Sequence, residues 1–417
     1  MTRAAAAMDR PAVAGCRVVI VVQNLGFPQD PRVSAFATTL KSAGFSVEVI
    51  APGRADQPPD ETFDGIVVHR FAEPAGGRGT LGYAWEILKS LWGIARARGR
   101  LAKGGAGYIL HICNPPDVLW VPFLLPPRAS VMIYDQHDLV PELYLAKGGR
   151  VRSMQHRALL WMERLVFRMA DVVLAPNASY ARTAILRGRV APSHVHIVRN
   201  APRPESWFPV PQRSEIRGEA DVVICYVGSI AYQDGVEDLV RAMAMLKQRK
   251  ARPRYRCLVA GSGEAKDATE RLAVSLGLHE DVQFLGWVAS PERLREIVAS
   301  ADIAVEPCRS NPFNDASTMV KLMDYLVMGK SIVAYNLPEH RVTVGDAGVL
   351  VPPYTLAEGL ADAIEQLAGD AARREALGAA AISRLSDAGL TFRDTQRALL
   401  DAYYDACNIA KARGLTW

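Results

Sequence analysis

The feature that most constrains the fold is an alternation of short apolar runs with helical segments along almost the whole chain. Apolar runs of four to eight residues between helices are typical of buried strands in a parallel sheet, because helices cover both faces of such a sheet. The first half of the chain holds runs of this kind at 17–23, 46–52, 108–112, 131–135, 171–176 and 194–200. A second set lies at 221–228, 255–261, 282–287, 302–307, 330–334 and 348–352.

The segment 200–220, rich in proline and charge, separates the two sets. This pattern predicts an α/β protein of two Rossmann-like, doubly wound domains with an interdomain cleft at the carboxyl ends of the strands, where ligands bind. We predict a disordered leader over 1–15, a first domain over 16–202, a linker over 203–220, a second domain over 221–389 and a C-terminal helix over 390–417 that is free to pack back on the first domain.

Length and composition narrow the class of protein. A chain of 417 residues suits two domains, and no run approaches the ~18 apolar residues of a membrane-spanning helix. The six cysteines are scattered without metal-ligand spacing, which suits a reducing cytoplasm. Val13-Ala14-Gly15-Cys16 resembles a lipoprotein cleavage box, but Asp9-Arg10-Pro11 stands where a signal peptide needs its apolar core.

Positive charge is concentrated in the first half. Residues 1–200 hold 24 Lys/Arg against 15 Asp/Glu, so an anionic partner is expected there, either nucleic acid or an anionic membrane surface. No nucleic-acid module or basic-aromatic interleaving supports the first. The helical segment 84–103 supports the second, because a basic amphipathic helix can lie on anionic lipid; alternatively it simply covers a sheet. Its apolar stripe is Trp85, Leu88, Trp92 and Ala95, with Lys89, Arg96, Arg98, Arg100 and Lys103 nearby.

The segment 311–334 combines an amphipathic helix with polar residues before it. Ser317 or Thr318 is suited to cap the helix, which leaves Lys321 and Asp324 on the face opposite its apolar stripe. A helix N-terminus attracts phosphate, and Asp324 lies ~10 Å further along the axis, about the distance from a pyrophosphate to ribose hydroxyls. The alternative is an exposed polar face with a capping serine. The apolar stripe is Met319, Leu322, Met323, Leu326 and Val327; Gly329 ends the helix, and 331–334 reads as a strand.

The order of motifs resembles glycosyltransferase family 4, in particular a bacterial subgroup of that family. YVGSIAYQDGVEDLVRAM, LVAGSGE, VQFLGWV, ADIAVEP and STMVKLMDYLVMGKSIVA follow the family order in the second half. VVQNLGFPQDPRV, CNPPDVLW, YDQHDLVPELY, ADVVLAPNASY and IVRNA do so in the first. The resemblance covers about residues 16–400. It implies the GT-B fold and retaining transfer of a sugar from a nucleotide diphosphate donor, usually without a metal or other cofactor.

The resemblance also implies roles for individual residues. Asp324 would hold the ribose hydroxyls, although family members generally have glutamate there, and Leu285 would lie at the nucleobase. His137 would stand beside the reacting sugar. Glycine after a strand allows close approach of a ligand to the backbone. The donor side would further include Gly228, Ser229, Gly261 and Gly263, and the acceptor side Asn24, Arg32, Asp138 and Glu142.

Two departures from the family pattern concern charge. The first of the family's usual glutamate pair is replaced by Ala316, so Asp315 or Asn314 would take over its contact with the donor sugar. The basic pair that neutralises the diphosphate is replaced by Ser229 and Asp234. The substitutes we expect are Lys321, Arg309 and the amides of Ser317, Thr318 and Met319, because the leaving group needs charge stabilisation.

With the resemblance, these observations predict a cytoplasmic glycosyltransferase that is either free or peripheral at the inner membrane face. The resemblance implies that it is retaining and uses a UDP-sugar more readily than a GDP-sugar. Its acceptor would be a lipid-linked glycan intermediate or a soluble small molecule. Alternatives are a GT-B sugar-nucleotide epimerase, or a catalytically inactive scaffold that binds a nucleotide sugar. Catalytic roles fall to His137, Lys321 and Asp315.

Overall fold

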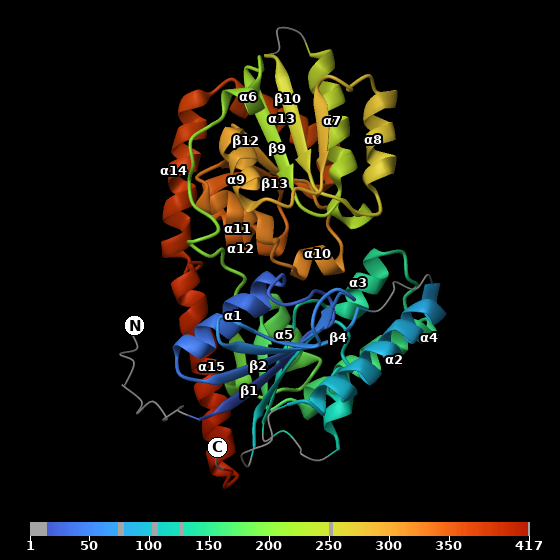
Figure 1. The fold of residues 1–417 in the computed structure, drawn as a ribbon. Helices are drawn as coiled ribbons and strands as arrows, with labels where there is room; N and C mark the ends of the chain where they lie inside the picture. Colours follow the sequence, from blue (N-terminus) through green and yellow to red (C-terminus); the bar gives the residue numbers. More distant parts are fainter. Residues whose placement is uncertain are drawn as a thin grey trace. The chain divides into compact units, whose positions relative to one another are not determined.

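A computed structural model describes residues 15–73, 79–101, 107–125, 129, 131–249 and 253–415. The predicted leader therefore lies, except for Gly15, outside the described residues. The chain divides into two compact units (Figure 1). The first comprises residues 1–144, 149–199 and 395–417, and the second comprises 145–148 and 200–394.

The first unit is built on a sheet of order β3-β4-β2-β1-β5-β6-β7-β8. All neighbours pair in parallel except β3 and β4, which form an antiparallel hairpin at one edge. This hairpin is absent from the sequence prediction, whereas the other strands match it. The strands are β1 (Arg17–Val21), β2 (Ser46–Gly53), β3 (Asp60–Phe63), β4 (Ile66–Ala72), β5 (Ile109–Cys113), β6 (Val131–Asp135), β7 (Val172–Ala175) and β8 (Val195–Ile197).

Helices cover this sheet on both faces, as the buried apolar runs require. Ile94 of α2 and Phe167 of α4 belong to one apolar cluster with Leu110 of β5, so α2 and α4 cover the same face. The Oη of Tyr403, in the C-terminal helix α15, is hydrogen-bonded to Nδ1 of His111 in β5 (2.6 Å). The helices are α1 (Pro31–Ser42), α2 (Gly79–Arg98), η1 (Val121–Phe123), α3 (Val140–Ala146), α4 (Met154–Met169), α5 (Ala178–Leu186), η2 (Pro192–His194) and α15 (Phe392–Ala412), the last beginning in the second unit.

The second unit holds a fully parallel sheet of order β11-β10-β9-β12-β13-β14. Its strands are β9 (Val222–Val227), β10 (Tyr255–Ala260), β11 (Val282–Gly286), β12 (Ile303–Glu306), β13 (Ser331–Tyr335) and β14 (Gly348–Val351), all within the predicted runs. Its helices are α6 (Ser214–Arg217), η3 (Tyr232–Asp234), α7 (Val236–Gln248), α8 (Lys266–Ser275), α9 (Pro291–Ser300), α10 (Pro312–Ala316), α11 (Val320–Val327), α12 (Pro338–Val344), η4 (Gly345–Ala347), η5 (Pro353–Thr355), α13 (Leu356–Ala368) and α14 (Ala371–Asp387).

The segment 200–220 lies against the second unit. Ile216 of α6 is buried in the core of that unit, and Trp207 and Val210 pack against the same cluster. The side chains that a free linker would leave in water are thus covered by apolar contacts.

The start of the helix around Asp324 differs from the sequence prediction. Asn311 caps a separate short helix, α10, by accepting from the amides of Phe313 and Asn314. The helix that carries Asp324, α11, begins only at Val320, after Met319, and has no side-chain cap. Ser317 instead donates its hydroxyl to the Phe313 carbonyl. The predicted Ser317 or Thr318 cap is therefore wrong. The predicted end at Gly329 is confirmed, because this residue has φ of 59° just after the helix.

Among the described residues, no helix is both long and apolar enough to cross a bilayer.

Candidate active site

Two glycine turns shape the carboxyl edge of the second sheet. A Cβ on Gly261 would stand 1.8 Å from the Gly228 carbonyl oxygen, and one on Gly263 would stand 2.5 Å from that of Ile230. Any larger residue would push the loop after β10 away from the loop after β9. These glycines therefore have a packing role, and the ligand contact that we expected of them stays a prediction.

Lys321, near the start of α11, lies where β9 and β12 end. Its Nζ lies 2.9 Å from the carboxylate of Glu306, the last residue of β12. The same ammonium also donates a hydrogen bond to Tyr226 Oη at 3.0 Å. Burial alone lowers the pKa of this ammonium, but Glu306 reverses the effect and raises it well above its ordinary value. A Cβ on Gly228 would meet Lys321 Cε at 2.6 Å, so glycine makes room for this side chain.

The predicted cation at this edge is therefore already paired. Glu306 is fully buried, and Asp234 lies 3.8 Å from the same ammonium, so one positive charge faces two carboxylates. Burial raises the pKa of Asp234, and Lys321 opposes that shift. Lys321 thus supplies less free positive charge than the sequence suggested.

Arg309 and Asn314 also have partners within the second unit. Arg309 forms ion pairs with Glu237 and Asp238 of α7, at 2.7 Å in each case. The Asn314 amide donates to the carbonyls of Gln233 (2.8 Å) and Arg309 (2.7 Å) and is almost fully buried. Both side chains thereby hold the loop after β12 in place, and their roles at the donor stay predictions.

The remaining residues of this loop have fewer hydrogen-bond partners. Asp315 accepts from Ser310 through Oδ2 (3.0 Å), whereas its buried Oδ1 has no hydrogen-bond partner among the described residues. Thr318 donates to Glu339 at 3.4 Å. The Ser317 amide donates to Asn314, so the proposed phosphate contact through this amide is wrong. Met319 packs against the apolar core.

Asp324 is the most unusual group of this edge. It lies in the middle of α11 with 9% exposure, between the buried Met323 and Tyr325, so the exposed polar face that was the alternative interpretation does not describe it. Burial raises the pKa of its carboxyl well above the usual range. Within the described ranges, no hydrogen bond or ion pair reaches this carboxylate. A buried carboxylate without a partner is costly, so its presence points to a ligand.

Two further donor-side candidates stay compatible with a ligand. Ser229 is exposed just after β9, and its carbonyl accepts from Tyr226. Leu285, in β11, is partly buried against the core, and the following Gly286 accepts a hydrogen bond from the Gly261 amide (2.8 Å).

In the first unit, Asp135 at the end of β6 is the centre of a buried charge network. Arg32 donates to both of its oxygens, at 2.6 and 2.9 Å. Nε2 of His137 lies 2.9 Å from Oδ2, and Nε2 of His111 lies 3.3 Å from it. Burial alone raises the pKa of Asp135, but Arg32 and His137 hold it well below the usual range. The carboxylate is therefore ionised and fully engaged.

This network orients His137. With Nε2 turned to Asp135, its Nδ1 is the nitrogen left for other contacts. The amides of His137 and Asp138 donate to Asn114 Oδ1, at 2.6 and 3.1 Å, so the loop itself is fixed. The His137 side chain retains 17% exposure, which keeps it within reach of a ligand.

Two acceptor-side predictions are corrected and two remain. Arg32 is buried against Asp135 and does not face an acceptor phosphate. Glu142, in the first turn of α3, is ion-paired with Arg187 (2.5 Å) and is structural. Asn24 is exposed after β1, and Asp138 is half-buried beside His137, so both remain compatible with acceptor binding.

One group of metal-ligating side chains occurs among the described residues. Donor atoms of His111, Cys113 and Asp135 lie within 4.8 Å of one another, all buried. Both Asp135 oxygens already accept from Arg32, whose positive charge disfavours a cation beside it. This donor set fits an ion-pair network better than a metal site.

Sequence reasoning missed the two carboxylates that organise these edges, Glu306 and Asp135. Each is the last residue of an otherwise apolar buried strand. An acidic residue at that position must find a partner at the carboxyl edge of the sheet. That signal was available in the sequence.

Comparisons with known proteins identify relatives of this chain. Residues 221–370 match the family model described as glycosyl transferases group 1, and residues 29–201 match the glycosyl transferase 4-like domain. The chain is 28% identical over 253 residues to the D-inositol 3-phosphate glycosyltransferase of Corynebacterium aurimucosum, an alignment covering 58% of each protein's length. It is 28% identical over 303 residues to the alpha-D-kanosaminyltransferase of Streptomyces kanamyceticus, covering 70% of this chain and 75% of that one.

A solved structure shows the same fold. Anabaena HepE, in complex with UDP and glucose, superposes with a TM-score of 0.65 and 16% identity, over 93% of this chain and 99% of that one.

Proposed function

Because this chain belongs to the family-4-type group 1 glycosyltransferases and has their GT-B fold, we propose that it is a retaining enzyme using a UDP-sugar. The reaction would move a sugar from the nucleotide diphosphate to an acceptor hydroxyl without a required metal. The occupied structure of Anabaena HepE, which holds UDP and glucose, supports uridine over guanosine as the base.

The observation that carries this proposal is the partnerless carboxylate of Asp324. Two adjacent ribose hydroxyls are suited to such a group, because each donates a hydrogen bond to one oxygen of an ionised carboxylate. Binding would also restore the partners that burial has removed, and so favour the ionised form. Asp315, whose buried Oδ1 lacks a partner within the described chain, is the matching candidate for a sugar hydroxyl.

His137 would act on the reacting sugar from the first unit. Its orientation by Asp135 leaves Nδ1 to contact a sugar hydroxyl, and the low-lying pKa of Asp135 keeps a negative charge behind the ring. Such a charge stabilises a polarised hydrogen bond from the ring when charge develops in the transition state.

The charge balance around Lys321 favours one second candidate, a nucleotide-sugar-binding protein without turnover. Two carboxylates flank the ammonium that should stabilise the leaving diphosphate. A transferase would still use Lys321 if a bound diphosphate displaces Asp234, the more distant of the two.

A donor panel followed by mass spectrometry tests the proposal. Purified protein is incubated with UDP- and GDP-sugars, with and without chelator, and with phosphorylated and unphosphorylated small-molecule acceptors. We expect transfer or slow hydrolysis of a UDP-sugar, unaffected by chelator, and a product whose anomeric configuration matches the donor. Binding without any product supports the inactive alternative, and inversion of configuration contradicts the mechanism.

The acceptor would be a lipid-linked intermediate at an anionic membrane surface. The predicted stripe of α2 is indeed exposed, with Trp85 at 60%, Leu88 at 57% and Trp92 at 64%. Lys89 and Arg96 lie over the two indole rings. Arg98 and Arg100 are bonded within the unit, and Lys103 lies outside the described residues. A soluble acceptor is the alternative, and D-inositol 3-phosphate in the name of the Corynebacterium relative is an acceptor of that kind.

Vesicle sedimentation separates the two acceptors. We expect salt-reversible binding to anionic vesicles, since each nearby basic residue contributes about 1 kcal/mol. The Trp85→Ser/Trp92→Ser variant should lose it, while Tyr354→Ser, which alters an exposed ring of the second unit, should not. Absence of binding at low salt would favour a soluble acceptor.

A further inference from the structure

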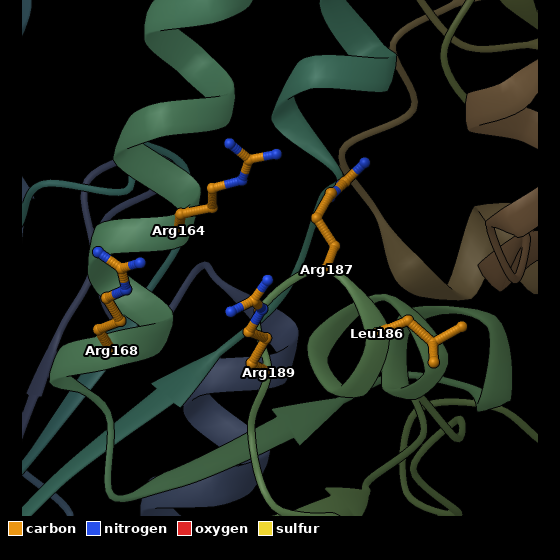
Figure 2. Close-up of a pocket in the computed structure, with 6 residues that line it drawn as sticks. Arg164, Arg168, Leu186, Arg187 and Arg189 are labelled. Carbon is orange, nitrogen blue, oxygen red and sulfur yellow. The ribbon is translucent and has the colours of Figure 1, made fainter.

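A second feature of the first unit is a pocket lined mainly by arginine. Its volume is about 300 Å³, at the lower end for ligand sites. Figure 2 shows Arg164 and Arg168 projecting from α4, and Arg189 from the turn that follows α5. Leu186, Arg187 and Gly188 complete its lining.

The pocket lies apart from the proposed reaction site. Arg168 shortly precedes β7 and Arg189 precedes β8, so both lie toward the amino ends of these strands. His137 follows the carboxyl end of β6. In a parallel sheet these ends are opposite edges, and the pocket therefore needs a role other than donor binding.

Close packing builds this pocket into the fold. A Cβ on Gly188 would lie 2.6 Å from the Phe167 ring, and Phe167 is buried in the core. Only glycine lets the turn after α5 rest directly on α4. The backbone thereby brings Arg189 beside the arginines of α4.

The arginines of the pocket differ in how they are paired. Arg187 is bound to Glu142 and Glu163, at 2.5 and 2.6 Å, and points away from the others (Figure 2). In the part of the chain that the structure describes, no carboxylate lies within ion-pair distance of Arg164, Arg168 or Arg189. Three exposed guanidinium groups thus share one pocket without a counter-charge.

This arrangement of arginines destabilises the folded protein in two ways. Arg164 and Arg168 are like charges one helical turn apart, which destabilises a helix. Arg189 has φ of 60°, a left-handed conformation that disfavours a residue with a Cβ. A position in the last turn of α4 explains Arg168, because cations are favourable there, but it explains neither Arg164 nor Arg189. Repulsion and backbone strain that no contact within the protein explains indicate a bound ligand.

We propose that this pocket binds a phosphate-bearing anion, such as a phosphomonoester or a diphosphate group. Guanidinium groups donate paired hydrogen bonds that match phosphate oxygens, and a dianion would remove the repulsion among the three cations. The group would come either from a free phosphate compound or from a lipid headgroup.

Calorimetric titration with inorganic pyrophosphate tests this site directly. The pocket variant is Arg164→Gln/Arg189→Gly, in which glycine suits the left-handed backbone. Arg373→Gln, an exposed arginine of the second unit, is the control. We expect saturable binding by the wild type and the control, and an affinity at least roughly tenfold lower in the pocket variant. Its melting temperature without ligand should be equal or higher, which excludes loss of binding through misfolding.

Vesicles of phosphatidylglycerol and of phosphatidylcholine separate the two sources. If the ligand is a lipid headgroup, the pocket variant loses binding to the anionic vesicles as well. If it is a free phosphate, the pocket variant loses only pyrophosphate. Equal affinity of wild type and pocket variant for both probes, or no saturable binding of either probe by the wild type, overturns the proposal.

Discussion

The two sheets differ in the surroundings of the buried carboxylate near their carboxyl edges. In the first unit, Asp135 accepts from Arg32 and lies against His111 and His137, so its charge is fully offset within the protein. In the second unit, Asp324 is buried with no partner in the described chain, and its pKa is raised. The first carboxylate organises a network of ion pairs, and the second is the one for which we propose a ligand. The following predictions test that contrast, from the largest expected effect to the smallest.

The largest effect should follow Asp135→Asn. The change leaves Arg32 buried without its counter-ion, which costs roughly 3–5 kcal/mol in the free energy of unfolding. Chemical denaturation, followed through the transition of the first unit, measures it. Asp401→Asn, an exposed site on α15, is the control. A loss for Asp135→Asn as small as the ~0.5 kcal/mol of a surface change would contradict the network.

The pair Lys321 and Glu306 tests whether the second edge also contains a structural charge. Lys321→Gln/Glu306→Gln removes both charges and keeps polar groups of similar size, so it should fold. If the ammonium stabilises the leaving diphosphate, turnover falls by about 10²–10³-fold, as for loss of a transition-state donor. Binding of the bare nucleoside should change much less. Turnover that survives unchanged would assign Lys321 a structural role alone.

A smaller effect concerns the stability of the ligand-free protein against pH. Because burial raises the folded-state pKa of Asp324, the folded protein binds its proton more tightly, and stability falls as pH rises above the unfolded value of ~3.9. Asp324→Asn removes this loss.

Urea denaturation at a series of pH values measures the effect. We expect the Asp324→Asn protein to be the more stable one above that pH, with a gap that widens by up to about 1.4 kcal/mol per pH unit until the folded-state pKa is reached. Asp387→Asn, at an exposed carboxylate, should show no such gap. If the wild type has the larger free energy of unfolding at neutral pH, the carboxylate must have a stabilising partner.

Much of the fold could be predicted because strands buried on both faces leave continuous apolar runs. The hairpin of β3 and β4 was not predicted because β4 contains His69 and Arg70, which interrupt its apolar run. These charged residues are buried by partners that sequence spacing does not reveal: His69 contacts Glu48 on β2 at 3.0 Å, and Arg70 is paired with Glu61 on β3. Long-range pairing thus hid a strand that its own composition argued against.

The site was predicted by residue type more successfully than by role. Asp324 and Lys321 were predicted and lie at the carboxyl edge of the second sheet. Arg309, Asn314 and Arg32 were also predicted, but they contact partners within their own units. A charged side chain looks the same in sequence whether it faces a ligand or a buried partner. The carboxylate that decides between these cases can lie far along the chain, as Asp135 does from Arg32.

The most direct test of the contrast is calorimetric titration of UDP into wild type and Asp324→Asn. If Asp324 holds the ribose hydroxyls, the variant should bind UDP more weakly by roughly 1.5–3 kcal/mol, while it remains folded. Glu270→Gln, at a partly exposed carboxylate of α8 whose ion-pair partner among the described residues is Lys266, should bind as the wild type does. Equal affinity of the folded Asp324→Asn protein and the wild type would contradict the account.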